Sequence, residues 1–346
     1  VRAGVTQSSR AFYREVSYGQ LDLSADIFGP FNLSGSFSDY FEKRAFKAGF
    51  VQACITAADS DVDVTKNVDF TKYDTVLCVS QSLTGSTPNS AWPSGSLDKF
   101  GPYKTSHGDV NIAFISMPHN WSTIDTRSIG EVFSHELGHN LGLRDLYEPI
   151  VQNRNVSGWD LMARSADYPH FCLADRMRLG WVQDTWVAVF NFENATTRRD
   201  ETVTLSPVEL NPTVGKIGIE VRISKGHNYY LEYRSSQATQ IGDQKLPLNN
   251  RVLVTDVIAP TQQFPSARPN ILLPPLDKDL DGPVLGNGQD YEETDVDALK
   301  DFSASVSGID GSKADVRIQY GANSKPDLTI TPWPGGGDKS YQSPDI

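Results

Sequence analysis

The sequence has few cysteines and no long apolar run, and each shortage excludes a class of protein. Its three cysteines, Cys54, Cys78 and Cys172, cannot all pair and form no Cys-x-x-Cys motif. The chain is therefore not a disulfide scaffold, although one disulfide remains open. No stretch of about 18 apolar residues occurs, so we expect no membrane-spanning helix.

Positive charge is also scarce. The 31 Lys and Arg residues are outnumbered by 43 Asp and Glu residues, which gives a formal net charge of −12. Nucleic acids and anionic membrane surfaces select for basic patches on their partners. We therefore expect neither as the main partner, and this acidity suits an extracellular protein or one that binds calcium.

The remaining composition is that of a globular protein, with 38% hydrophobic and 21% charged residues. A chain of 346 residues exceeds one average domain, so we expect two packed units. We predict an α/β unit over residues 1–185 and a β-rich antiparallel unit over residues 186–322. Residues 323–346 are rich in Pro, Gly and Asp and are predicted to link to a further module.

The first unit is predicted to begin with a strand region, which a long helix follows. Residues 11–31 alternate and carry aromatic side chains, which predicts strands. Residues 36–58 show apolar residues at helical spacing, with Ser36 or Ser38 as a plausible N-cap. We therefore expect a long helix that packs on a sheet.

Two buried strands and a second helix are predicted next. Residues 75–80 and 109–117 are short apolar runs typical of buried strands. The second helix should start near Asp125 or Thr126, because apolar residues follow at three- and four-residue spacing, and it should stop at Gly142. Past residue 186, short alternating runs predict strands near residues 203–205, 216–221, 229–233, 251–257 and 314–320.

The second predicted helix carries a metal-binding pattern. His135 and His139 lie four residues apart, so their imidazoles share one face of the helix and can hold one metal ion. The helix break at Gly142 lets the chain turn back and bring in Asp145 as a third ligand. Peptide hydrolysis needs an activated water and a polarised carbonyl, and zinc with three protein ligands supplies both. Glu136 can then act as general base on the zinc-bound water.

This pattern resembles a known family. His135-Glu136-x-x-His139-x-x-Gly142-x-x-Asp145 is similar to the long zinc motif of the metzincin peptidases, in the variant with aspartate as third ligand. The segment Ser-Gly-Trp-Asp-Leu-Met-Ala at residues 157–163 resembles the stretch leading to their Met-turn. With Leu-Gly-Trp at residues 179–181, the combination is similar to secreted peptidases of the immune inhibitor A type.

The resemblance implies a metzincin-like catalytic domain over residues 1–185 and a catalytic Zn²⁺. It also implies that Met162 packs apolar surface beneath the histidines without binding the metal. The chain would then be a secreted zinc endopeptidase that acts on protein or peptide substrates, with a propeptide or inhibitor as a candidate regulator.

Two departures from the family pattern concern the turn before the third ligand and the oxyanion donor. Arg144 stands where that family usually has proline, which leaves the turn before Asp145 less rigid. Arg164 occupies the position two residues past Met162, where some metzincins carry a tyrosine that stabilises the transition state. Tyr168 is only a distant substitute, so the oxyanion donor stays open.

Two other functions fit the same motif. The chain could be an extracellular binding or adhesion module with a structural zinc site, but such sites usually have four protein ligands and give Glu136 no role. A zinc hydrolase of non-peptide bonds is the second alternative.

The remaining candidates are weaker. Asp277, Asp279 and Asp281 begin a calcium-loop pattern, but its twelfth position is Gly288 and not glutamate, so only a looser Ca²⁺ site is open there. We interpret the other histidines as surface or satisfied core residues. Among them His119 is of most interest, because it follows the strand at residues 109–117 and the resemblance to metzincins implies that this strand borders the substrate cleft.

Overall fold

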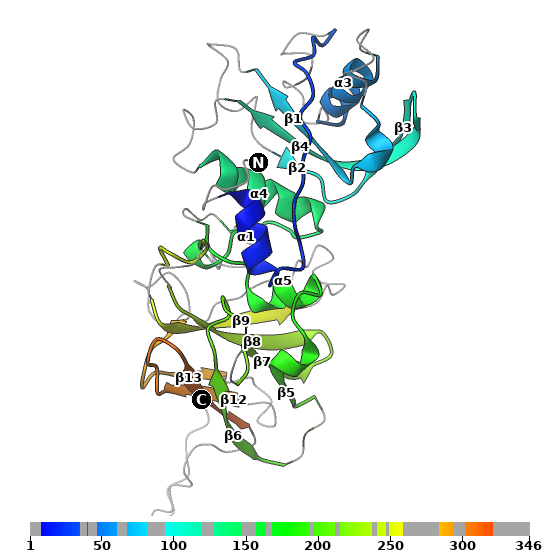
Figure 1. Ribbon diagram of the computed structural model, residues 1–346. Coiled ribbons are helices and arrows are strands. Elements are labelled where there is room, and N and C mark those ends of the chain that lie inside the picture. Colours follow the sequence, from blue (N-terminus) through cyan, green and yellow to red (C-terminus); the bar gives the residue numbers. More distant parts are fainter. Residues whose placement is uncertain are drawn as a thin grey trace, which may run out of the picture.

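The chain folds into a mixed α+β structure in which sheets predominate (Figure 1). The computed structural model describes residues 8–34, 40, 47–60, 68–81, 94–119, 128–146, 157–163, 168–193, 195, 197–211, 215–236, 241–246, 249–258, 284–293 and 302–320. None of the described helices is long and apolar enough to cross a membrane.

The first sheet is built on one long strand, β4 (Gly108–Pro118). Strand β1 (Thr75–Ser80) pairs with β4 in parallel, and β2 (Ser94–Gly95) and β3 (Phe100–Thr105) pair with it antiparallel. The buried strands predicted at residues 75–80 and 109–117 are β1 and β4. The side chains on both faces of β4 are buried along most of the strand, which explains its nearly continuous apolar sequence.

One helix covers each face of this sheet. Helix α3 (Lys47–Asp59) packs on the face of Cys78, Ile112 and Phe114, and its buried residues are Phe50, Val51, Ile55 and Ala58. It is the described part of the helix predicted over residues 36–58, and the expected caps Ser36 and Ser38 lie outside the described residues. Helix α4 (Ile129–Asn140) covers the other face, where Ile115 and Met117 point.

The N-terminal prediction of strands over residues 11–31 was wrong. Residues Ser9–Val16 form helix α1, and the Ser8 hydroxyl caps it by accepting the Ala11 N–H. The apolar residues Phe12, Tyr13 and Val16 are spaced for one face of a helix, and all three are fully buried. Residues 20–33 then form neither helix nor strand.

Helix α1 lies beneath α4 in the middle of the molecule (Figure 1). The Tyr13 hydroxyl donates to the Ser134 carbonyl of α4 at 2.6 Å, and the Ser9 hydroxyl donates to the Gly130 carbonyl at 2.9 Å. A short helix, α5 (Leu173–Arg178), follows between α1 and the second half of the chain.

From Val187 onward every described element is a strand. A five-stranded sheet has the order β10 (Val284–Leu285), β9 (Arg251–Ile258), β8 (His227–Arg234), β7 (Gly218–Ser224), β5 (Val187–Asn191). A four-stranded sheet has the order β11 (Asp290–Glu293), β12 (Phe302–Ser307), β13 (Ala314–Tyr320), β6 (Arg199–Leu205). The two sheets share one apolar core, so they form a sandwich.

The prediction of antiparallel pairing in this half holds for all strand pairs described there but one. Strand β5 runs parallel to β7, because the chain leaves the first sheet to form β6 in the second and returns as β7. The sandwich also packs on the N-terminal half. Leu253 and Val284 belong to the core around α1 and α4, and Tyr230 packs with Leu173 of α5.

Candidate metal centre

Helix α4 presents the two predicted histidine ligands on one face. It begins at Ile129, where the Ser128 hydroxyl accepts the Glu131 N–H, and not at Asp125 or Thr126, which lie outside the described residues. It ends at Asn140, and Gly142 has φ +90°, a left-handed conformation that favours glycine. The chain turns back there, as predicted, and brings Asp145 over the helix.

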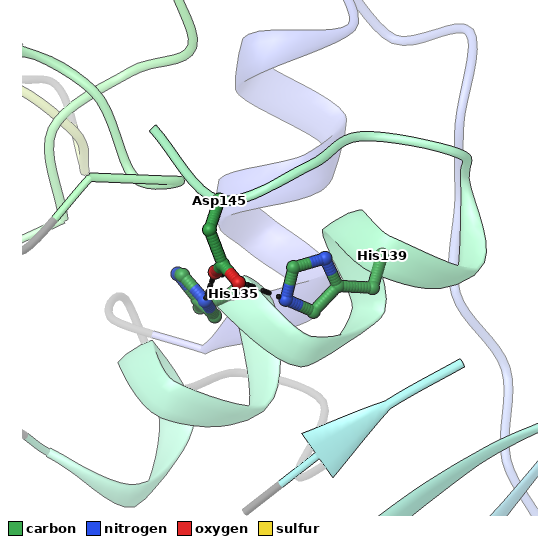
Figure 2. A group of neighbouring side chains, drawn as sticks. All are labelled: His135, His139 and Asp145. Carbon is green, nitrogen blue, oxygen red and sulfur yellow. Dashed lines mark hydrogen bonds and ion pairs between the residues drawn. The ribbon is translucent and has the colours of Figure 1, made fainter. Parts of the chain in front are cut away.

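The side chains of His135, His139 and Asp145 converge (Figure 2). Their ligand atoms all lie within 4.8 Å of one another. The Asp145 Oδ1 atom is 3.1 Å from His135 Nε2 and 3.3 Å from His139 Nε2. A tetrahedral zinc ion with ligands at about 2.0–2.1 Å separates neighbouring ligand atoms by about 3.3–3.4 Å, so the two distances from Asp145 to the histidines are compatible with this ion.

Backbone carbonyls fix the orientation of both imidazoles. His135 Nδ1 lies 2.7 Å from the Leu161 carbonyl oxygen, and His139 Nδ1 lies 2.8 Å from the Leu143 carbonyl oxygen. Because a carbonyl oxygen can only accept, each Nδ1 donates a proton to it, which leaves Nε2 as the ring nitrogen that can face a metal ion beside Asp145. This is the arrangement that ligating histidines have in metal sites.

The charges of the cluster also suit a cation. Burial raises the pKa of Asp145, but its bonds to His135 and His139 outweigh burial and hold the pKa well below its usual range. Burial lowers the pKa of His139, but the bond to Asp145 and the charge of Glu136 outweigh it and raise that pKa. Two carboxylates thus lie close to the histidines. Within the described part of the chain, no fourth His, Cys, Asp or Glu joins the cluster.

Glu136 is held beside the cluster by the edge of the first sheet. It is 7% exposed, and its Oε2 atom accepts the backbone N–H of Gly95 on β2. A Cβ atom at Gly95 would lie 2.1 Å from the Glu136 carbonyl oxygen and 3.0 Å from His139 Cβ. Only glycine therefore lets β2 approach α4 this closely.

Met162, the residue expected at the Met-turn, packs against helix α4 at Gly138. Its side chain is fully buried, and a Cβ atom at Gly138, between the two histidines, would lie 2.5 Å from the Met162 sulfur. The turn that carries Met162 also supports two predicted ligands. The Leu161 carbonyl accepts from His135, and the Met162 carbonyl accepts the N–H of Leu146, the residue after Asp145, at 2.8 Å.

The remaining candidates lie elsewhere. Tyr168, the distant substitute for an oxyanion donor, places its hydroxyl near Gly130 at the N-terminal end of α4, a full turn before His135. His170 is fully buried with Nε2 2.7 Å from Glu15 and Nδ1 2.6 Å from Arg176, so it is a satisfied core residue. His119 is exposed at the end of β4. Arg164, Asp277, Asp279 and Asp281 lie outside the described residues.

Besides the Leu161 and Leu143 carbonyls, two side-chain or backbone positions that support the site, Gly95 and Asp160, were not predicted. Gly95 lies on a two-residue strand and gave no sequence signal. Asp160 is fully buried, and its carboxylate accepts the N–H groups of Met162 and Cys172, both at 2.6 Å. A carboxylate two residues before the methionine was a readable signal, because aspartate commonly bonds to the backbone two residues on.

No protein-family model matches the sequence, and no curated protein matches it. The likeness to metzincins therefore rests on the motif residues themselves.

Proposed function

We propose that this chain is a zinc-dependent endopeptidase with His135, His139 and Asp145 as metal ligands and Glu136 as general base. The observation that supports this most directly is the convergence of three ligand atoms at zinc spacing, with a carboxylate on the adjacent helical residue. A structural zinc site would need a fourth protein ligand and would leave Glu136 without a role.

The protein groups divide the work of peptide hydrolysis. A Zn²⁺ ion bound at this site would supply Lewis acidity and lower the pKa of a bound water to near 7. The Gly95 N–H holds Oε2 of Glu136 in place, which leaves Oε1 to accept a proton from the attacking water. The same oxygen then donates that proton to the leaving amine. The Leu161 and Leu143 carbonyls keep both imidazoles aligned throughout.

The proposal extends to partners and location. Proteins or peptides are the proposed substrates, a propeptide or an inhibitor the proposed regulator, and the extracellular space the proposed site of action. The metzincin-like architecture of the first half is part of the same proposal. A sheet edge next to Glu136 and a methionine beneath the histidines support it.

The deciding experiment is the substitution Glu136→Gln. Zinc content is measured, together with cleavage of a casein-like substrate before and after chelation. We expect the variant to keep about one zinc per chain and to lose roughly 10²–10⁴-fold in activity, because general-base catalysis contributes that much. Near-normal cleavage by a zinc-loaded Glu136→Gln variant would contradict the proposal.

Glu131→Gln is the matched control, because Glu131 is buried on the same helix but lies one turn before His135. It should keep both zinc and activity. A wild-type chain that binds zinc but cleaves no protein would favour a binding module or a hydrolase of other bonds.

A further inference from the structure

Arg234, at the end of β8, is a fully buried arginine that joins the β-rich half to the metal-site half. Its guanidinium forms a two-pronged pair with Asp243, through Nε at 2.7 Å and Nη2 at 2.6 Å. Nη1 donates to Glu232 at 2.8 Å and to the Trp159 carbonyl at 2.9 Å. With a bond from Nη2 to the His170 carbonyl, all five N–H donors have acceptors.

The Trp159 carbonyl begins the turn that supports the metal ligands. Two residues later the Leu161 carbonyl holds His135 Nδ1, and the Met162 carbonyl holds the amide next to Asp145. Asp160 lies between Trp159 and Leu161 in this turn. Its carboxylate accepts the N–H of Cys172, the residue before α5, and so connects the turn to that helix. A displacement at residue 159 would therefore move the first and third ligands together.

The acceptors of Arg234 anchor the same region from the other side. Asp243 accepts the His170 N–H at 2.8 Å, and Glu232 accepts the Leu173 N–H. Glu209 Oε1 lies 3.4 Å from Arg234 Nε, so three carboxyl groups surround one guanidinium. A buried cation held by this many partners has little freedom to move.

We propose that Arg234 and Asp160 are positioning residues for the metal centre, through which the β-rich half holds His135 and Asp145 in binding geometry before the metal arrives. This inference rests on the proposed metal function of those ligands. The β-rich half of the chain would then help to position the metal ligands, although none of the described ligands lies in that half. This positioning requires arginine, because lysine cannot direct five planar donors.

The test is zinc affinity, measured by competition with a chelator of known affinity at a temperature well below unfolding. We expect Arg234→Lys and Asp160→Asn each to weaken zinc binding roughly 10-fold or more, as loss of groups that orient ligands typically does. The visible absorption of the Co²⁺-loaded chain should also change, because it reports ligand geometry.

Two control variants separate positioning from stability. Arg317→Lys breaks a two-pronged pair with Asp200 on the exposed face of the same half. Val316→Ala creates a cavity in the sandwich core, away from Arg234. Arg317→Lys should change neither zinc affinity nor Tm. Val316→Ala should lower Tm without changing zinc affinity. An Arg234→Lys variant that loses Tm like Val316→Ala but keeps its zinc affinity within twofold would overturn the inference.

Hydrogen exchange of the wild-type chain without metal is a second test of the inference, and it does not depend on whether a variant folds. The amides of Leu146, Met162 and Cys172 should be strongly protected, because the turn is formed before metal binds. Exchange as fast as in an exposed loop would refute the inference. Zinc binding without peptide cleavage would count against the proposed enzyme alone, whereas a wild type that binds no zinc would count against both.

Discussion

Gly138 lies where helix α4 passes over Met162, and a larger residue there has no room. A Cβ atom would lie 2.5 Å from the Met162 sulfur and 3.3 Å from its methyl carbon. Alanine favours a helix by up to about 1 kcal/mol over glycine, but overpacking a buried site costs about 1–3 kcal/mol. We expect Gly138→Ala to lower both the free energy of unfolding, measured in urea, and the zinc affinity.

Gly49 provides the matched control, because it also lies within a helix, α3, but has nothing within 4 Å of its Cβ position. Gly49→Ala should raise the free energy of unfolding by up to about 1 kcal/mol, the helix-propensity gain alone. If Gly138→Ala were as stabilising as Gly49→Ala, Met162 would not be packed against the helix as described.

At the residue scale, the sequence predicted the side chains that converge at the candidate metal centre and missed the groups that hold them. His135, His139 and Asp145 could be read because two histidines four apart share a helical face and Gly142 permits the return. The Gly95 N–H and the Leu161 carbonyl are backbone groups, which every residue carries. Their role depends on which distant segments meet, and no local pattern reports that.

Helix α3 and strand β1 are joined by a contact between two thiols. Cys54 packs against the core that contains Cys78, and the hydrogen bond that the Cys78 thiol makes with Cys54, together with burial, raises the pKa of Cys78. Cys172 belongs to a different core. Of the three cysteine pairs that the sequence left open, only Cys54 with Cys78 is therefore adjacent in the fold, and both are free thiols here.

We expect oxidation by a small-molecule disulfide such as oxidised glutathione to join Cys54 to Cys78. Two thiols would form one disulfide, and the oxidant would be reduced to two thiols. Thiol titration after denaturation should then find one cysteine, Cys172, and stability should rise by roughly 3 kcal/mol for a loop of this size. Cys54→Ser should abolish the gain, whereas Cys172→Ser should keep it. A chain that retains three thiols under these conditions would show that the contact cannot close.

At the element scale, segments with a clear apolar pattern were predictable, and two-residue strands such as β2 were not. The alternating runs predicted near residues 203–205, 216–221, 229–233, 251–257 and 314–320 are strands β6, β7, β8, β9 and β13. Strands β1 and β4 and helix α4 follow clear apolar patterns, and their predicted positions agree with the structure to within a few residues. Helix α1 was predicted as strand, because its aromatic residues favour strands locally. Residues 9–16 form a helix because one helical face packs between α4 and the β-rich half. A local window of eight residues contains no information about that tertiary packing.

At the scale of the whole molecule, the net charge is −12, and several of the carboxyl groups are buried where the two halves of the chain meet. Burial raises the pKa of Asp160 and of Glu209, whereas Arg234 and His170 lower that of Asp243 despite burial. Some of these acids are therefore neutral in the folded state at a pH where they would be ionised in the unfolded chain.

Asp175, in the first turn of α5, shows what this does to stability. Burial, together with the neighbouring Asp160 and Glu232, raises its pKa from 3.8 to about 8. Between these values the folded chain holds a proton that the unfolded chain has lost, so this contribution to stability is complete below pH 3.8 and disappears as the pH rises toward 8.

Asp175→Asn is neutral at every pH and should become more stable relative to wild type as the pH rises from 5 to 8, by up to about 1.4 kcal/mol per pH unit. Urea unfolding at both pH values measures this difference. Asp200→Asn is the control, because Arg317 lowers the pKa of the exposed Asp200. Asp200 is therefore ionised in both the folded and the unfolded chain between pH 5 and 8. Its effect should be equal at both pH values. An Asp175→Asn effect that is likewise independent of pH would mean that Asp175 is already charged in the fold, and that the junction between the halves tolerates another buried anion.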